Sequence, residues 1–271
     1  MEGVALLPGD PAVELEGIEV ARRDLGRGFA AASWDALQAA SHRSGSRDVA
    51  SADRRRQLPS IGLLPATLER LHRLGSSILI LPAGWDDDSR AREDGEALVG
   101  RLSCGQPVEA GAAAEVRDRL PQSRREAQLE ALARFLHEAS GQAPGVQVAL
   151  CAPASPAGLL DPAGLSLLRQ ESSLRGVGYW HDVGAVQTRA SLGLEDPGAW
   201  LEAGGGAILG ASLQDCARGR DRLPPGEGEV DFRLIAEYLP GSARRVMSLA
   251  PGYPVAVVRE ARQALTSLGL G

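Results

Sequence analysis

The chain has 271 residues, 44% of them hydrophobic and 24% charged, which is the composition of a globular protein. This length suits one large domain, so we predict a single domain over residues 1–271. The formal net charge of −6 argues against nucleic acid as a partner, because nucleic-acid-binding proteins normally carry a basic surface for phosphates. All 29 basic residues are arginine. The absence of lysine excludes Schiff-base chemistry and the lysine-dependent phosphate loop.

The cysteines and the apolar runs indicate a cellular setting. Cys104, Cys151 and Cys216 are odd in number and far apart, so neither a disulfide framework nor a cysteine zinc site is indicated. The first ten residues lack the basic start and apolar core of a signal peptide. The apolar runs are too short to cross a bilayer. We therefore expect a cytoplasmic protein that has no membrane partner.

The first third of the chain gives weak structural signals. Residues 17–21 fit a strand, and residues 33–41 fit a short helix capped by Ser33. Residues 41–60 are polar and arginine-rich and fit neither. Leucines at helical spacing predict a helix over 65–75 that ends at Gly75, followed by a buried strand over 77–84.

Residues 84–122 form a long charged segment after that strand. We predict an insertion that holds a helix, and it is either a lid over a site or a solvated loop. The next segment, 123–141, has the pattern of an amphipathic helix. Ser123 is its predicted N-cap and Glu126 completes a capping box.

The rest of the chain alternates between strand and helix patterns. The predicted strands cover 146–152, 176–184, 207–215 and 244–251, and the predicted helices cover 161–170, 196–204, 230–239 and 254–269. Successive strands lie about thirty residues apart, the length of a crossover between parallel strands. The pattern predicts an α/β fold, a single (β/α)8 TIM-type barrel that is irregular in its first third. An open doubly wound sheet is the alternative.

Three segments in the second half carry a resemblance to a known family: HDVGA at 181–185, LQDCARGRDRLPPGEGEVDF at 213–232 and RRVMSLAP at 244–251. This half resembles the xylose-isomerase-like TIM barrels, which include sugar phosphate isomerases, epimerases and apurinic endonucleases. The resemblance covers residues 123–271 well and the first third poorly. It implies a divalent metal held at the strand ends by a carboxylate, an Asp and His pair, a further His and a final Glu.

Most positions that would hold this metal carry other residues. The first Glu falls at Cys151, the Asp is kept as Asp182, and its neighbouring His is replaced by Ala185. Ser212 and Gln214 stand where histidines are expected, although Asp215 is kept. In the loop, Asp221 and Arg222 replace an Asp-His pair, and Ser248 replaces the last Glu.

Strand alternation predicts how these side chains point. If Asp182 faces into the barrel, then Gly178 and Trp180 do so too, and His181 faces outward. The predicted ligand-binding residues at the barrel mouth are Asp182, Ser212, Gln214, Asp215, Ser248 and Trp180, and Cys151 lies beside them. This set is poor in the anionic or imidazole ligands that a divalent ion needs, so we predict no metal and no other cofactor. A weakly bound divalent metal is the alternative.

Each candidate also has a purely structural interpretation. Cys151 has the character of a small buried hydrophobe, and His181 that of a packing residue. Asp182 and Asp215 could equally hydrogen-bond backbone amides after their strands. Turn geometry and the helix dipole account for Glu227 and Glu229. Trp180 and Tyr179 suit either a sugar-stacking surface or the core.

The leading hypothesis is a barrel that has lost its catalytic metal site and binds a small sugar- or phosphate-like ligand, or a protein partner, without catalysis. The alternative is an active isomerase or epimerase. It would use Asp182 and Asp215 as weak metal ligands, or metal-free proton transfer by Cys151 and a glutamate such as Glu227. An apurinic endonuclease is the least favoured, because it needs a rich metal cluster and a basic groove. The oligomeric state stays open.

Overall fold

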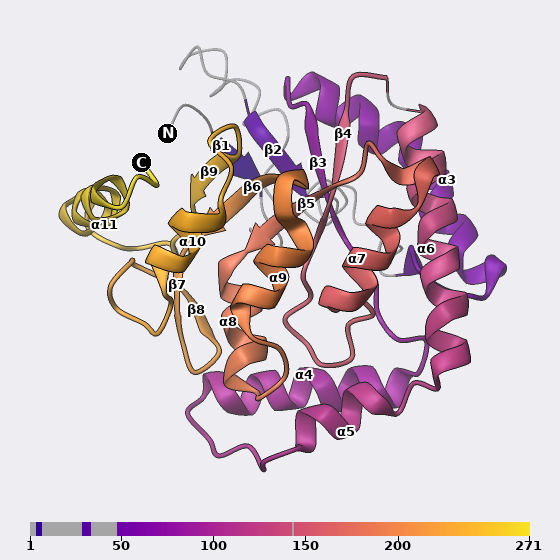
Figure 1. Ribbon diagram of the computed structural model, residues 1–271, viewed down its shortest axis with the longest axis horizontal. Helices are drawn as coiled ribbons and strands as arrows, with labels where there is room; N and C mark the ends of the chain where they lie inside the picture. Colours follow the sequence, from indigo (N-terminus) through magenta and orange to yellow (C-terminus); the bar gives the residue numbers. More distant parts are fainter. Residues whose placement is uncertain (1–3, 7–28, 34–47, 143) are drawn as a thin grey trace.

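The computed structural model describes residues 4–6, 29–33, 48–142 and 144–271. Seven parallel strands form one sheet in the order β1-β2-β3-β4-β5-β6-β9, and a separate hairpin pairs β7 with β8 (Figure 1). The strands are β1 (Val4–Leu6), β2 (Phe29–Ser33), β3 (Ile78–Pro82), β4 (Gln147–Cys151), β5 (Gly178–Asp182), β6 (Ile208–Leu213), β7 (Asp215–Ala217), β8 (Arg220–Leu223) and β9 (Arg244–Met247).

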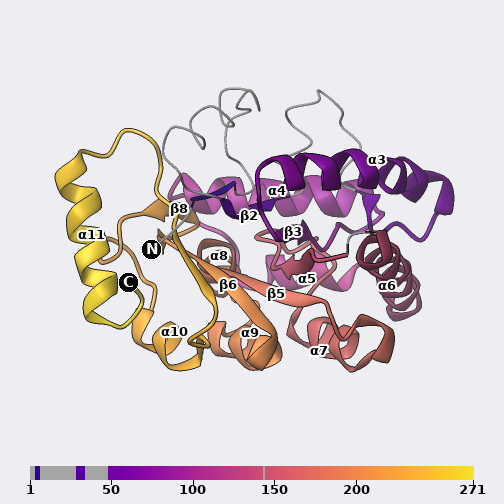
Figure 2. The ribbon, with the colours of Figure 1, turned by 90° about the horizontal axis from the view of Figure 1, so that it is seen from above.

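Helices connect the strands on one side of the sheet. They are α3 (Arg54–Arg73), α4 (Ser89–Ser103), α5 (Ala112–Asp118), α6 (Gln122–Gln142), α7 (Pro162–Gln170), α8 (Val183–Ser191), α9 (Pro197–Gly204), α10 (Phe232–Tyr238) and α11 (Val255–Ser267), with short 3-10 turns at Ser172–Leu174 and Gly205–Ala207. In Figure 2, α6, α7, α9 and α10 follow one another around the outside of the curled sheet. No described helix is both long and apolar enough to cross a membrane.

The strand order confirms the predicted α/β barrel type. Each strand pairs in parallel with the strand of the same sheet that follows it in the chain, with the β7–β8 hairpin inserted between β6 and β9, whereas a doubly wound sheet reverses its strand order. Within the described residues the sheet has seven strands rather than the expected eight, and no pairing joins β9 to β1. The carboxyl ends of the strands therefore meet at one edge, where barrel enzymes carry their sites.

The two faces of the sheet pack separately because side chains alternate along each strand. The outer face carries residues such as Leu79, Leu150 and Tyr179, which pack against the helices in the main core. The inner face is a smaller apolar group made of Ala31, Ile78, Ile80, Ala149, Cys151, Trp180 and Val246.

Helix α3 is longer than the sequence pattern predicts. It begins at Arg54, where Asp53 caps it, and runs through both Pro59 and Pro65 to Arg73. Part of the segment that fitted neither helix nor strand is thus helical. The buried Gln57 side chain explains this, since its amide donates to the carbonyls of Val49 and Ala131, both at 2.8 Å. These contacts are non-local, so periodicity does not reveal them.

Other boundaries agree with the expectations or correct them. Gly75 follows α3 with a φ of 66°, as a C-terminal stop requires. Ser123 is not an N-cap, because α6 begins at Gln122. The Gln122 side-chain amide donates a hydrogen bond to the Glu126 carboxylate. Ser33 is the last residue of strand β2. The strand predicted over 17–21, and the helix predicted over 33–41 beyond Ser33, lie outside the described residues.

Candidate functional site

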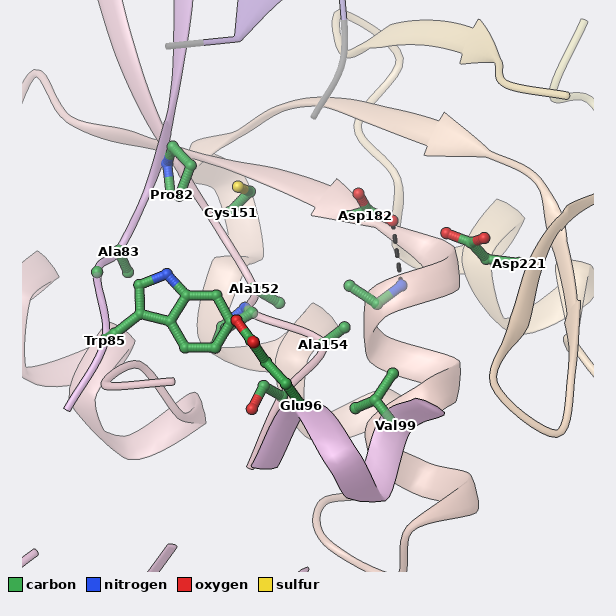
Figure 3. Close-up of a pocket in the computed structure, with 14 residues that line it drawn as sticks. Pro82, Ala83, Trp85, Glu96, Val99, Cys151, Ala152, Ala154, Asp182 and Asp221 are labelled. Carbon is green, nitrogen blue, oxygen red and sulfur yellow. Dashed lines mark hydrogen bonds between the residues drawn. The ribbon is translucent and has the colours of Figure 1, made fainter. Parts of the chain in front are cut away.

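A cavity of about 330 Å³ lies at the carboxyl ends of β3, β4 and β5 (Figure 3). Its walls come from the segments that follow β3 and β4, from the start of α8, from α4 and from the β7–β8 hairpin. The lining residues are Pro82, Ala83, Gly84, Trp85, Glu96, Val99, Cys151, Ala152, Pro153, Ala154, Ser155, Asp182, Ala185 and Asp221. This is the place where an open end of a parallel sheet usually binds its ligand.

Helix α4, from the charged segment 84–122, forms one wall through Glu96 and Val99. Asp88 caps its start by accepting from the Arg90 amide at 2.9 Å. Gly95 faces Ser155 and Ala157 so closely that a Cβ at this position would collide with them. The absence of a side chain lets the helix rest directly on the segment after β4. The predicted insertion therefore contains two helices, and the first of them borders the cavity.

Buried ionic contacts fix the segment after β4. The Arg189 side chain is fully buried and makes two hydrogen bonds with the Glu195 carboxylate, at 2.6 and 2.7 Å. The same guanidinium donates to the Ser155 carbonyl at 2.8 Å and lies 5.7 Å from the Trp200 ring centroid. A buried charge needs such complete pairing. The cavity wall at Pro153–Ser155 is consequently held in one conformation.

Asp182 is the last residue of β5 and the N-cap of α8. Its Oδ1 accepts from the Ala185 backbone N–H and from the Gln214 side-chain amide, both at 3.1 Å. Figure 3 shows the other oxygen pointing away from the helix. Burial, reinforced by the charge of Asp221, raises the pKa of Asp182 to about 6, although the Ala185 amide opposes the shift. This carboxyl group therefore changes protonation just below neutral pH.

Asp221 enters the cavity from the β7–β8 hairpin and lies on the same side as Asp182 in Figure 3. Gly184, in the first turn of α8, has no side chain, which leaves room for Gln214 and Asp221. Burial raises the pKa of Asp221, and the charge of Arg222 opposes that change. Two carboxyl groups thus share this part of the wall.

Several residues predicted from the sequence lie apart from the cavity lining. Trp180 packs in the inner apolar group and donates from Nε1 to the Ser212 hydroxyl at 2.8 Å. Gln214 contacts Asp182 but does not line the cavity. The Ser248 side chain is buried, and its backbone N–H donates to the Leu213 carbonyl.

Asp215, the first residue of β7, is bound to the segment that follows β8. Its Oδ1 accepts from the amides of Cys216 at 2.8 Å and Val230 at 3.1 Å, and its Oδ2 accepts from Gly226 at 2.8 Å. These bonds organise the Gly-Glu-Gly-Glu turn, in line with the structural interpretation of this residue. Glu227 is exposed on that turn and does not line the cavity.

His181 lies on the outer side of β5, as strand alternation predicts. It is 1% exposed, and its Nδ1 is 3.2 Å from the Tyr179 hydroxyl. Burial lowers the pKa of His181 to about 3, so the ring is neutral near pH 7. Tyr179 stacks on Trp200 with ring centroids 6.1 Å apart. Both residues thus serve packing behind the site.

Trp85, Glu96 and Asp221 are lining residues that the sequence reasoning did not select. Trp85 had a usable signal, since it follows the end of a buried strand by three residues. Glu96 has no such signal because it is one of many charges in its segment. Asp221 was recognised only as a position in the loop.

The described residues contain no group of three or more His, Cys, Asp or Glu side chains arranged to hold a metal ion. In the cavity, Asp182 and Asp221 are the closest approach to such a group, and one oxygen of Asp182 already accepts two hydrogen bonds. The donor set therefore does not fit a divalent cation. The carboxyl groups of Asp182 and Asp221 can instead accept hydrogen bonds from hydroxyl groups, pair with a positive charge or transfer a proton.

The sheet order and the position of the cavity are those of an α/β fold of the TIM-barrel type, and the chain shares this fold with solved structures of sugar epimerases and of an AP endonuclease. Solved structures of this kind include a 3-keto-D-glucoside 4-epimerase from E. coli, with a TM-score of 0.60, 15% identity and coverage of 98% of this chain and 99% of that one. An L-ribulose 3-epimerase matches with a TM-score of 0.61 and 18% identity, over 98% of this chain and 82% of that one.

A family 2 AP endonuclease from Brucella melitensis gives a TM-score of 0.62 at 14% identity, over 97% of this chain and 88% of that one. At these identities the similarity shows the fold alone. No family model matches the sequence. No curated protein matches it either.

Proposed function

We propose that this protein binds a small polyhydroxylated, sugar-like ligand in the cavity beside α4, without a catalytic divalent metal. The observation that carries the proposal is the composition of the cavity wall. Carboxylates of Asp182 and Asp221 stand opposite apolar and aromatic surface from Trp85 and Val99, in a space of about 330 Å³. Ligand sites of this size combine an apolar surface with a few polar groups.

The donor set supports metal-independent binding. Where the resemblance implies metal ligands, Cys151, Ala185, Gln214 and Ser248 supply a thiol, a methyl group, an amide and a hydroxyl. Asp215 is another acidic candidate from the sequence, and both of its carboxylate oxygens accept hydrogen bonds from backbone amides. The epimerase structures with the same fold are consistent with a sugar-class ligand.

The test is calorimetric titration of chelator-treated protein with aldoses, ketoses and sugar alcohols. We expect at least one to bind with the same affinity in EDTA and in added Mn²⁺. Trp85→Leu should weaken that binding, since it removes the aromatic surface, whereas Tyr238→Leu, far from the cavity, should not. Binding that requires the metal would contradict the proposal.

A metal-free isomerase or epimerase is a second candidate, and the pKa of about 6 at Asp182 favours it. A general base works best when its pKa is close to the working pH. Such an enzyme would exchange a carbon-bound hydrogen of an aldose or ketose with solvent. Proton NMR in D2O measures this exchange, and it should vanish in Asp182→Asn. If a sugar binds but none of its carbon-bound hydrogens exchanges with solvent, the result would favour a binding protein over an enzyme.

A further inference from the structure

The ionisable side chains among the described lining residues of the cavity are all acidic. Three of its described lining residues are ionisable acids, Glu96, Asp182 and Asp221, and no described arginine or histidine lines it. They come from three separate elements, α4, β5 and β8. The acids therefore surround the space instead of lying along one exposed helix face.

Arg222 compensates the charges of Asp182 and Asp221 only in part. Arg222, next to Asp221 in β8, lowers the pKa of both Asp182 and Asp221. Burial outweighs that effect for both carboxyl groups. Their ionised forms are thus under-stabilised in the structure as it stands, and a positive charge in the cavity would stabilise them.

Trp85 adds a second recognition element. Its indole lies on the side of the cavity opposite Asp182 and Asp221 (Figure 3). An ammonium group beside an indole ring gains cation–π attraction, and tryptophan is the best of the aromatic side chains for this contact. No described arginine or histidine lines the cavity to pair with a phosphate, whose negative charge would lie close to the carboxylates of Asp182 and Asp221.

We infer that the ligand of this cavity is an amine-bearing polyol, such as an amino sugar, and that phosphorylated sugars are excluded. This inference rests on the proposed function, because it names the chemical class bound at the same site. It also chooses between the sugar-like and phosphate-like ligands that the sequence left open.

The test compares matched probes by calorimetry at pH 7.5 and low salt. The pairs are glucosamine with glucose, and 1-amino-1-deoxysorbitol with sorbitol, and glucose 6-phosphate is the anionic probe. We expect each amine to bind about tenfold more tightly than its neutral partner, which corresponds to about 1.4 kcal/mol. The phosphate should bind more weakly than glucose. The amine preference should shrink as salt is added, because these charges are partly exposed.

Asp182→Asn supplies the decisive variant, since asparagine also caps a helix start. It should reduce the amine preference to about twofold or less. Asp196→Asn is the matched control: Asp196 caps α9 through the Gly198 amide and does not line the cavity. It should keep the full preference.

The outcomes separate this inference from the proposed function. Equal binding of amine and neutral probes, or tighter binding of glucose 6-phosphate, would overturn the amine inference and leave the proposed polyol site intact. An amine preference that survives in Asp182→Asn would also overturn it. Failure of every sugar, polyol and amine to bind would overturn both.

Discussion

At the scale of single residues, Asp182 carries opposing demands. It caps α8 and accepts from Gln214, yet burial and Asp221 make its ionised form unfavourable, with a pKa of about 6. A carboxyl group whose folded-state pKa is raised stabilises the fold most when it is protonated. That contribution is complete below the unfolded value near 3.8 and is lost as the pH rises through about 6.

We therefore predict that Asp182→Asn stabilises the protein at pH 7 by about 1 to 3 kcal/mol relative to the wild type, and by much less at pH 4. Asparagine keeps the cap and the acceptor for Gln214 while removing the charge. Urea unfolding of both proteins between pH 4 and 7.5 measures the difference. The control Asp196→Asn should show a difference that changes little over this range. A stability gain for Asp182→Asn that is flat or falls with pH would contradict the raised pKa.

At the scale of elements, the packing of α4 decides the shape of the cavity. Gly95 lies against Ser155 and Ala157, whereas a Cβ at Gly100, on the same helix, would have nothing within 4 Å. Both glycines lie inside the helix, where alanine is intrinsically favoured by about 0.5 to 1 kcal/mol. The pair thus separates helix propensity from close packing.

Gly100→Ala should stabilise the protein by about 0.5 to 1 kcal/mol. Gly95→Ala should instead destabilise it by about 1 to 2 kcal/mol, because its methyl group pushes α4 away from the segment after β4. Amide hydrogen exchange over residues 89–103 should become faster in Gly95→Ala alone, and ligand affinity should fall with it. Equal stabilisation by both substitutions would show that α4 does not depend on this contact.

At the scale of the whole molecule, apolar packing on both faces of the sheet holds the described strands together. The inner and outer faces of the sheet are both filled with apolar side chains, and the buried Arg189–Glu195 pair ties α8 to the segment after β4. Any group that binds the folded protein selectively raises its melting temperature. The response to chelation therefore reports on a resident metal.

We predict that the melting temperature changes by less than about 1 °C between about 1 mM EDTA and about 1 mM Mn²⁺ or Zn²⁺, since no bound ion adds to stability. Elemental analysis of the purified protein should give well under one equivalent of Mn, Mg, Zn or Fe per chain. A stoichiometric metal, or a melting temperature that drops in EDTA, would contradict metal-independent function.

Much of the fold was predictable because its signals are local. The strands β3, β4 and β6 are largely apolar runs, as expected where parallel strands are buried on both faces. Asp161 and Asp196 are the N-caps of α7 and α9, and such capping residues mark a helix start in the sequence. The first turns of α3, helix α8 and the β7–β8 hairpin were not predicted. For α3, the contact of the Gln57 side chain with the distant Ala131 carbonyl is one that periodicity does not reveal.

The candidate site was predictable in part. The resemblance marked Cys151 and Asp182, which line the cavity, and strand alternation placed His181 on the opposite face. The resemblance also marked Asp215, whose oxygens are taken by the amides of Cys216, Gly226 and Val230. Alternation gives the direction of a side chain but not its partners.

The sequence by itself determined the order of β3, β4, β5, β6 and β9, the inward face of β5 and the residue types at the positions the resemblance marks. These properties depend on residue identity and on periods of two or 3.6 residues. Only the tertiary structure decided that Trp85, Glu96 and Asp221, from three distant segments, border one cavity with Asp182. Burial and the charge of Asp221 then raise the Asp182 pKa, because desolvation and Coulomb interactions depend on distances in space that a sequence does not encode locally.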